Sequence, residues 1–141
     1  MAEKIKVNTG SKTYELEFED LKKSVVIRFN PRDPGLPVRI SELGKMLSEK
    51  VNKIKGCETD ENGKPLDKEA VRYYHDANKA LCIALDEAFK SNISDNVFKY
   101  CDALTMIGGN SFLSLFLSAV VPVIEAEQES VKNDYLEKYR K

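Results

Sequence analysis

A run of thirteen residues without a charged side chain, residues 112–124 (FLSLFLSAVVPVI), constrains the fold of this chain more than any other feature. As a helix, it would place nine large apolar side chains around most of its circumference, whereas a surface helix shows an apolar arc of roughly 100°. The run is too short for a bilayer span, which needs about 20 apolar residues. We therefore predict a helix that other protein surfaces cover on nearly every side.

Two arrangements can cover such a helix. Burying one large apolar side chain contributes roughly 1.5–3 kcal/mol, so three exposed ones would forfeit about 5–9 kcal/mol, which rivals the total stability of a domain. The helix is therefore either the centre of the core, wrapped by a sheet and other helices, or part of an interface with another chain. The residues that we predict for this protein interface are Phe112, Leu113, Phe116, Leu117, Val120 and Val121.

Apolar and polar residues alternate in three segments of the first thirty residues, at positions 5–7, 14–18 and 25–29. A period of two is typical of half-buried strands. Polar turns at residues 8–11 and 20–23 separate the segments. We predict an N-terminal three-stranded antiparallel β-meander, whose apolar face needs a helical layer because a small sheet alone is barely stable.

The remainder of the chain shows helical spacing of apolar residues. A proline-rich connection, residues 31–37, precedes it, and we expect Pro122 to bend or interrupt the last helix. Asp86 and Lys90 should form an ion pair on the solvent side of the second helix. The four predicted helices run from Ser41 to a stop at Gly56, from an N-cap at Asp67 to about Lys90, from Ser94 or Asp95 to a stop at Gly108-Gly109, and from Asn110 or Ser111 onward.

These elements predict the α+β class, with the meander in residues 1–30 and a four-helix layer in residues 38–141. The C-terminal helix would be the central element of that layer. A chain of 141 residues fits a single domain, residues 1–141.

Residues able to perform chemistry are few. His75 is the single histidine, and Cys57, Cys82 and Cys101 lie far apart, whereas a zinc site needs three or four close ligands. We therefore expect no catalytic residue, no metal and no cofactor. A net charge of −1 also argues against binding to nucleic acid or to an anionic membrane. The free thiols and the lack of a secretory signal predict a cytoplasmic location.

Short motifs are spread along the chain at residues 14–18 (YELEF), 29–34 (FNPRDP) with 38–40 (VRI), 95–101 (DNVFKYC) and 120–124 (VVPVI). These segments resemble a family of small uncharacterised proteins encoded by phages and prophages of Gram-positive bacteria, among virion and tail genes. The chain departs from the family at Lys99, which follows Phe98 where the family has a glycine.

The resemblance implies a role in the assembly or structure of phage tails and implies no catalytic residues. We therefore expect a non-enzymatic assembly chaperone or structural accessory that works through protein–protein contacts, either with itself or with tail components. Its place would be the cytoplasm of the bacterial host, or the virion. The alternative from the residues alone is a small cytoplasmic binding protein that inhibits or regulates a host protein.

Overall fold

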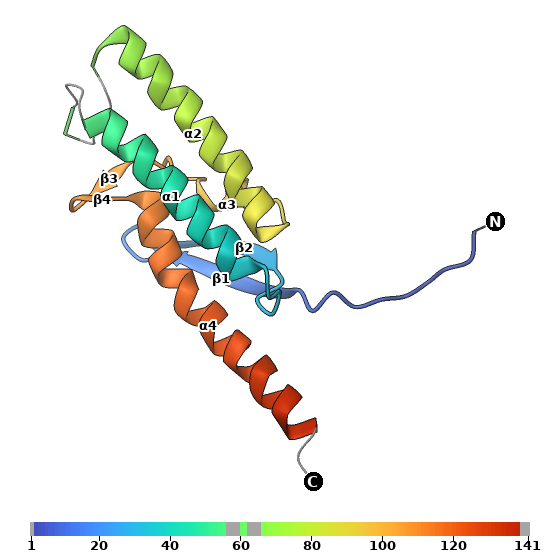
Figure 1. The fold of residues 1–141 in the computed structure, drawn as a ribbon. Coiled ribbons are helices and arrows are strands. Elements are labelled where there is room, and N and C mark those ends of the chain that lie inside the picture. The colour runs from blue at the N-terminus through green and yellow to red at the C-terminus, as the bar shows by residue number, and fades with distance from the viewer. Residues whose placement is uncertain (1, 56–59, 62–65, 139–141) are drawn as a thin grey trace.

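The chain has an α+β fold with an N-terminal antiparallel sheet and four helices, as the computed structural model shows for residues 2–55, 60–61 and 66–138 (Figure 1). At residues 135–138 only the backbone is described. The elements are β1 (Lys12–Phe18), β2 (Lys23–Phe29), α1 (Leu36–Lys55), α2 (Lys68–Phe89), α3 (Ser94–Val97), β3 (Met106–Ile107), β4 (Asn110–Ser111) and α4 (Phe112–Lys138).

Strands β1 and β2 form a hairpin in which Tyr14 lies opposite Ile27. The predicted alternation is confirmed, since the inward side chains Phe18, Ile27 and Phe29 are buried whereas those between them are exposed. The turn between the strands contains Lys22 at a φ of 53°, a left-handed conformation that is uncommon outside glycine.

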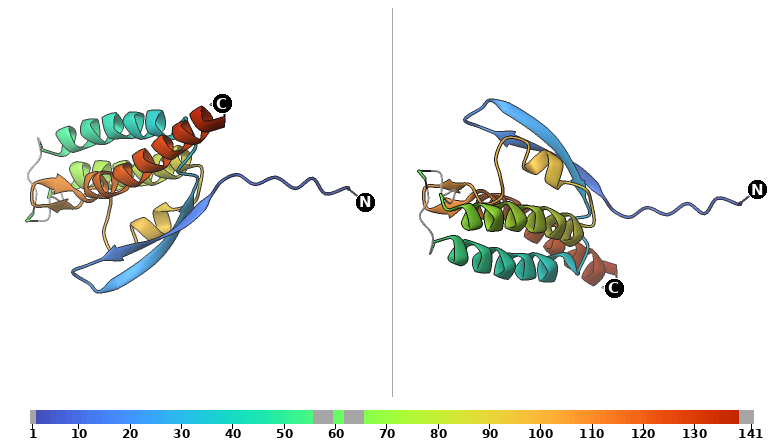
Figure 2. Two further views of the ribbon diagram at one scale, coloured as in Figure 1. Left: turned by 90° about the horizontal axis from the view of Figure 1, so that it is seen from below. Right: turned by 90° about the horizontal axis from the view of Figure 1, so that it is seen from above.

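The predicted third strand at residues 5–7 is not part of this sheet, which has two strands in the described chain. Residues 2–11 instead form an extended arm that runs away from the body (Figures 1 and 2). Ile5 and Val7 are 90% and 82% exposed on this arm. Two apolar side chains and a polar turn suffice for a strand pattern, but they do not determine whether the segment folds back on its neighbour.

Two helices follow the predicted spacing, with one changed start. Helix α2 has the predicted N-cap, because the Asp67 carboxylate accepts a hydrogen bond from the backbone N–H of Glu69. Helix α1 begins at Leu36 instead of near Ser41. The carbonyl of Asp33 accepts from the backbone N–H of Leu36, and Pro37 fits the first helical turn, where its missing N–H costs nothing.

Helix α3 has four residues and ends at Val97, well before the predicted stop. The two glycines expected to end it form the turn of a small hairpin between β3 and β4. Both are in the left-handed region, Gly108 at a φ of 59° and Gly109 at 86°. A two-residue hairpin turn of this type needs a positive φ at both positions, which glycine adopts without strain. Such turns are common in hairpins because their twist matches that of the flanking strands.

Asp86 does not form the surface ion pair that we expected with Lys90. Its carboxylate accepts hydrogen bonds from the backbone N–H groups of Ile93 and Ser94, at 2.8 Å each, and from the Ser94 hydroxyl at 2.7 Å. Lys90 ends α2 in a left-handed conformation, at a φ of 50°. Asp86 therefore joins the end of α2 to the start of α3.

Helix α4 continues through Pro122 to Lys138, and the interruption expected there does not occur. Ser111 caps its start, with its hydroxyl accepting from the backbone N–H of Ser114 at 3.2 Å. A proline leaves the carbonyl four residues earlier without its helical partner. Pro122 and Ser118 are both exposed, so water can satisfy that carbonyl and the helix can continue.

The core lies between the hairpin and a helical layer made by α1, α2 and α4 (Figure 2). The rings of Phe29 and Phe89 meet edge to face with centroids 5.0 Å apart, which joins the hairpin to α2. Phe116 of α4 lies 6.1 Å from Phe89, on the same apolar cluster. The apolar helix therefore takes a core position in the chain's own fold.

Candidate protein-binding surface

Burial divides the six residues predicted for a protein interface. Leu113, Phe116, Leu117 and Val120 are buried by other parts of the chain, so they offer a partner little surface in this fold. Phe112 and Val121 are half-buried. Nine positions apart on a helix, they lie on opposite faces of α4, and Phe112 packs against Phe18 and Phe98. The interface itself stays a prediction, and of these two residues Val121 is the one on the face toward α1.

Val121 lines a groove of about 540 Å³ between the start of α1 and the C-terminal half of α4, which we call the α1–α4 groove. Pro37 and Ile40 contribute the apolar wall on α1, and Val121 and Ile124 contribute the wall on α4. The polar residues that complete the lining are Ser41, Glu125, Gln128, Glu129 and Lys132. The result is an apolar channel with a charged rim.

Polar contacts hold the second half of α4 against the loop before α1, and we call this set the α4 latch. The Gln128 side-chain N–H donates to the backbone carbonyls of Pro31 and Asp33, both at 2.9 Å. The Glu127 carboxylate accepts from Lys12 at 2.5 Å and from Arg32 at 2.9 Å. These hydrogen bonds from Lys12 and Arg32 lower the pKa of Glu127 below its ordinary value.

We do not predict the latch from the sequence. One signal for it exists. Gln128 lies four residues after Ile124 and seven after Val121, so it shares their helix face. A glutamine on the face of buried residues indicates a buried hydrogen-bonding role, but its partners lie more than ninety positions away.

A smaller hollow of about 140 Å³ separates the hairpin from α4, and we call it the hairpin–α4 groove. Its lining is mainly apolar and includes Leu16, Ala119 and Val123. The Tyr14 hydroxyl is buried here without a hydrogen-bond partner among the described residues. Burial, followed by the charge of Glu127, raises the pKa of Tyr14.

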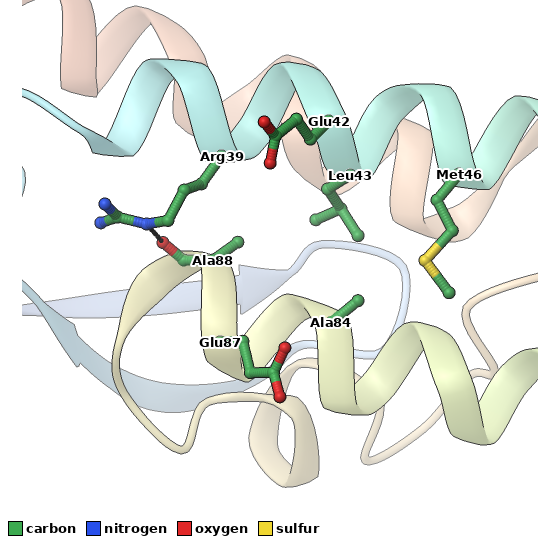
Figure 3. Close-up of a pocket in the computed structure, with 7 residues that line it drawn as sticks. All are labelled: Arg39, Glu42, Leu43, Met46, Ala84, Glu87 and Ala88. Atoms are coloured by element: carbon green, nitrogen blue, oxygen red, sulfur yellow. Dashed lines mark hydrogen bonds between the residues drawn. The ribbon is translucent and has the colours of Figure 1, made fainter.

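A third hollow, of about 250 Å³, lies between α1 and α2 (Figure 3). Arg39 at its end donates to the backbone carbonyl of Ala88 at 2.7 Å and pairs with Asp33. The guanidinium is therefore used to join α1 to the end of α2. Glu42 and Glu87 stand on opposite helices of the hollow (Figure 3), and Leu43 and Met46 supply apolar surface.

The residues considered for chemistry lie apart. His75 is exposed, with Tyr74 as its aromatic neighbour at 6.1 Å. Cys82 and Cys101 are free, half-buried thiols whose pKa values are raised by burial, and Cys57 lies outside the described residues. Within the described residues, no group of three or more His, Cys, Asp or Glu side chains is arranged to hold a metal ion.

Among the described helices, none combines the length and apolar composition that a membrane crossing needs. Of the three hollows described above, the α1–α4 groove is the largest. Comparison with protein-family models, with curated proteins and with solved structures finds no match to this chain.

Proposed function

We propose that this protein is a non-enzymatic accessory of phage or prophage tails, an assembly chaperone or a structural component, that binds a tail protein through the α1–α4 groove. The link to tails comes from the sequence resemblance. The binding role is inferred from the groove, because two helices held beside each other by the latch supply its apolar walls.

The latch gives the groove its binding-ready shape. Hydrogen bonds from Gln128 to Pro31 and Asp33 place the second half of α4 beside the start of α1 before any partner arrives. A preformed groove avoids part of the ordering cost that association otherwise carries. Apolar grooves of this type bind the apolar face of an amphipathic helix in many recognition modules.

The rim predicts the charge of the bound helix. Glu125 and Glu129 lie one helical turn apart on the rim, and Lys132 follows at its end. A helix with apolar side chains spaced three and four residues apart, flanked by lysine or arginine opposite Glu125 and Glu129, would complement this surface. The proposed occupant of the groove is such a helix, from a tail protein.

A matched pair of variants tests the role of the groove. Val121→Asp puts a charge on the apolar wall at a half-buried site, whereas Ala126→Asp puts the same charge on an exposed part of α4 outside the groove lining. Val121→Asp should weaken binding to the tail protein by about tenfold or more, equivalent to about 1.4 kcal/mol. Ala126→Asp should bind like the original chain. Leu117 is unsuitable because it is buried.

The measurement has two parts. The tagged chain is first recovered from cells in which the encoding phage or prophage is induced, and the captured proteins are identified by mass spectrometry. The affinity of each variant for the captured tail protein is then measured with purified components. Capture of a host regulatory protein instead would favour the inhibitor alternative, and equal binding by both variants would remove the groove from the mechanism.

A further inference from the structure

The N-terminal arm presents apolar side chains that nothing in the described chain covers. Ile5 and Val7 are 90% and 82% exposed, and they alternate with Lys4 and Lys6. The arm leaves the body in line with the start of β1 in all views (Figures 1 and 2). Alternation of this kind is the pattern of a strand with one apolar face and one basic face.

The arm is directed away from the hairpin by contacts at its base. The Asn30 side-chain N–H donates to the backbone carbonyl of Thr9 at 2.7 Å, and Arg28 donates to the carbonyl of Ser11 at 3.4 Å. These bonds keep residues 9–11 beside the end of β2. The arm therefore continues the direction of β1 and does not reverse onto it.

Strand β1 has an outer edge with which no other strand of the described chain pairs. The carbonyls of Val26 and Arg28 accept hydrogen bonds from Asn96 and Ser91, so they point away from β1. In an antiparallel pair, the residues opposite them, Glu15 and Thr13, must then point their backbone groups away from β2. The outer edge of β1 thus presents free backbone donors and acceptors.

We propose that two copies of this chain exchange their N-terminal arms, so that the arm of each copy adds as a third strand to the outer edge of β1 of the other. A two-fold axis near Gly10 and Ser11 places each arm antiparallel to the other copy's β1. Both contacts are then equivalent, as closed dimer symmetry requires. At about 3.4 Å per residue, arm residues 3–8 span about 20 Å, close to the length of β1.

One register satisfies the pattern of both strands. It places Lys4 opposite Glu17 and Lys6 opposite Glu15, so that each basic side chain meets an exposed acid on the outer face. Opposite charges on directly facing strand residues stabilise the pair. A shift by one residue would move the whole apolar face to the solvent. A shift by two would place either Lys6 opposite Thr13 or Lys4 opposite Glu19, which lies beyond the end of β1, so this register alone pairs both lysines with acids inside β1.

In the same register, the two apolar residues of the arm meet the apolar face of the hairpin. Ile5 lies opposite Leu16 and Val7 lies opposite Tyr14, both of which line the hairpin–α4 groove and are half-buried. Val123 of α4 is 38% exposed on the same groove. The exchanged arm would therefore cover apolar surface that the isolated chain leaves open, in addition to completing the sheet edge.

The first test is the molar mass in solution of the full chain, measured by light scattering over a range of concentrations. We expect a concentration-dependent dimer with a mass of about twice 15.9 kDa. The variant with both Ile5→Asp and Val7→Asp should stay monomeric at every concentration. Both sites are exposed, so circular dichroism should show an unchanged fold. A monomer at every concentration, or a dimer that survives both substitutions, would overturn the proposal.

The second test distinguishes exchange between copies from an arm that folds back on its own β1. One chain carries Lys4→Glu and Lys6→Glu, and the other carries Glu15→Lys and Glu17→Lys. Each variant alone juxtaposes like charges and should be monomeric. An equimolar mixture should form a dimer containing one copy of each, because every arm then meets an edge of opposite charge. Failure of the mixture to form it would refute exchange.

Discussion

Replacing Asp86 by alanine should lower the free energy of unfolding by about 3 kcal/mol. The carboxylate accepts three hydrogen bonds, two from the backbone N–H groups of Ile93 and Ser94 and one from the Ser94 hydroxyl. Ile93 is 1% and Ser94 is 5% exposed, so water has little access to these donors. Each bond to a charged group contributes about 1.5–3 kcal/mol, and the three are not additive because they share one carboxylate.

Urea unfolding followed by circular dichroism measures this effect. With a slope of about 2 kcal/mol per molar urea, the midpoint should fall by about 1.5 M while the slope is unchanged. Glu87→Ala, at the exposed neighbouring position, controls for the loss of a charge at the end of α2 and should change little. Asp86→Asn should be intermediate, because the amide keeps one acceptor oxygen. If Asp86→Ala differs from Glu87→Ala by less than about 1 kcal/mol, the proposed joint between α2 and α3 is unimportant for stability.

Two further predictions concern single polar groups. The hydrogen bond from Arg39 holds the pKa of Asp33 below its ordinary value of 3.8, so the stabilisation is present above pH 3.8 and disappears as the pH falls through the folded-state pKa. Asp33→Asn should therefore lower the free energy of unfolding by about 1 kcal/mol at pH 7. Urea unfolding should show a smaller loss at pH 2.5 than at pH 7, and an equal loss at both pH values would contradict the assignment. Tyr14→Phe removes a buried hydroxyl without a partner among the described residues and should leave thermal stability unchanged or raise it by about 1 kcal/mol, whereas a loss above 1 kcal/mol would mean that the hydroxyl is satisfied.

Local chemistry explains which elements the sequence predicts well. The hairpin strands show a clear period of two, and α2 has both an apolar stripe and a capping aspartate at Asp67. Each of these signals acts over a few residues and agrees with its tertiary surroundings. The long apolar run likewise predicts a helix with a core position, because its composition leaves few exposed faces.

Elements that depend on distant partners are predicted poorly. The apolar residues after Val97 pack against other elements without continuing α3, and Leu104 instead donates its backbone N–H to Asn78. Helix α4 continues past Pro122, and the latch that holds its second half uses Pro31 and Asp33, more than ninety positions earlier in the chain. For the candidate site, the sequence predicts Val121 as an interface residue but does not predict the α1 wall at Pro37 and Ile40. The sequence pattern does not indicate that α1 packs beside α4.

The covering of the hairpin by α4 has a consequence during synthesis. Phe18 at the end of β1 stacks with Phe112, at a centroid distance of 6.3 Å, and Ile27 shares the hairpin–α4 groove with Phe116 and Val120. At about 5–20 residues per second, the ribosome delivers α4 roughly 5–20 s after the hairpin. During that interval the nascent hairpin keeps an uncovered apolar face and an unpaired strand edge, and both features favour aggregation until α4 covers the face.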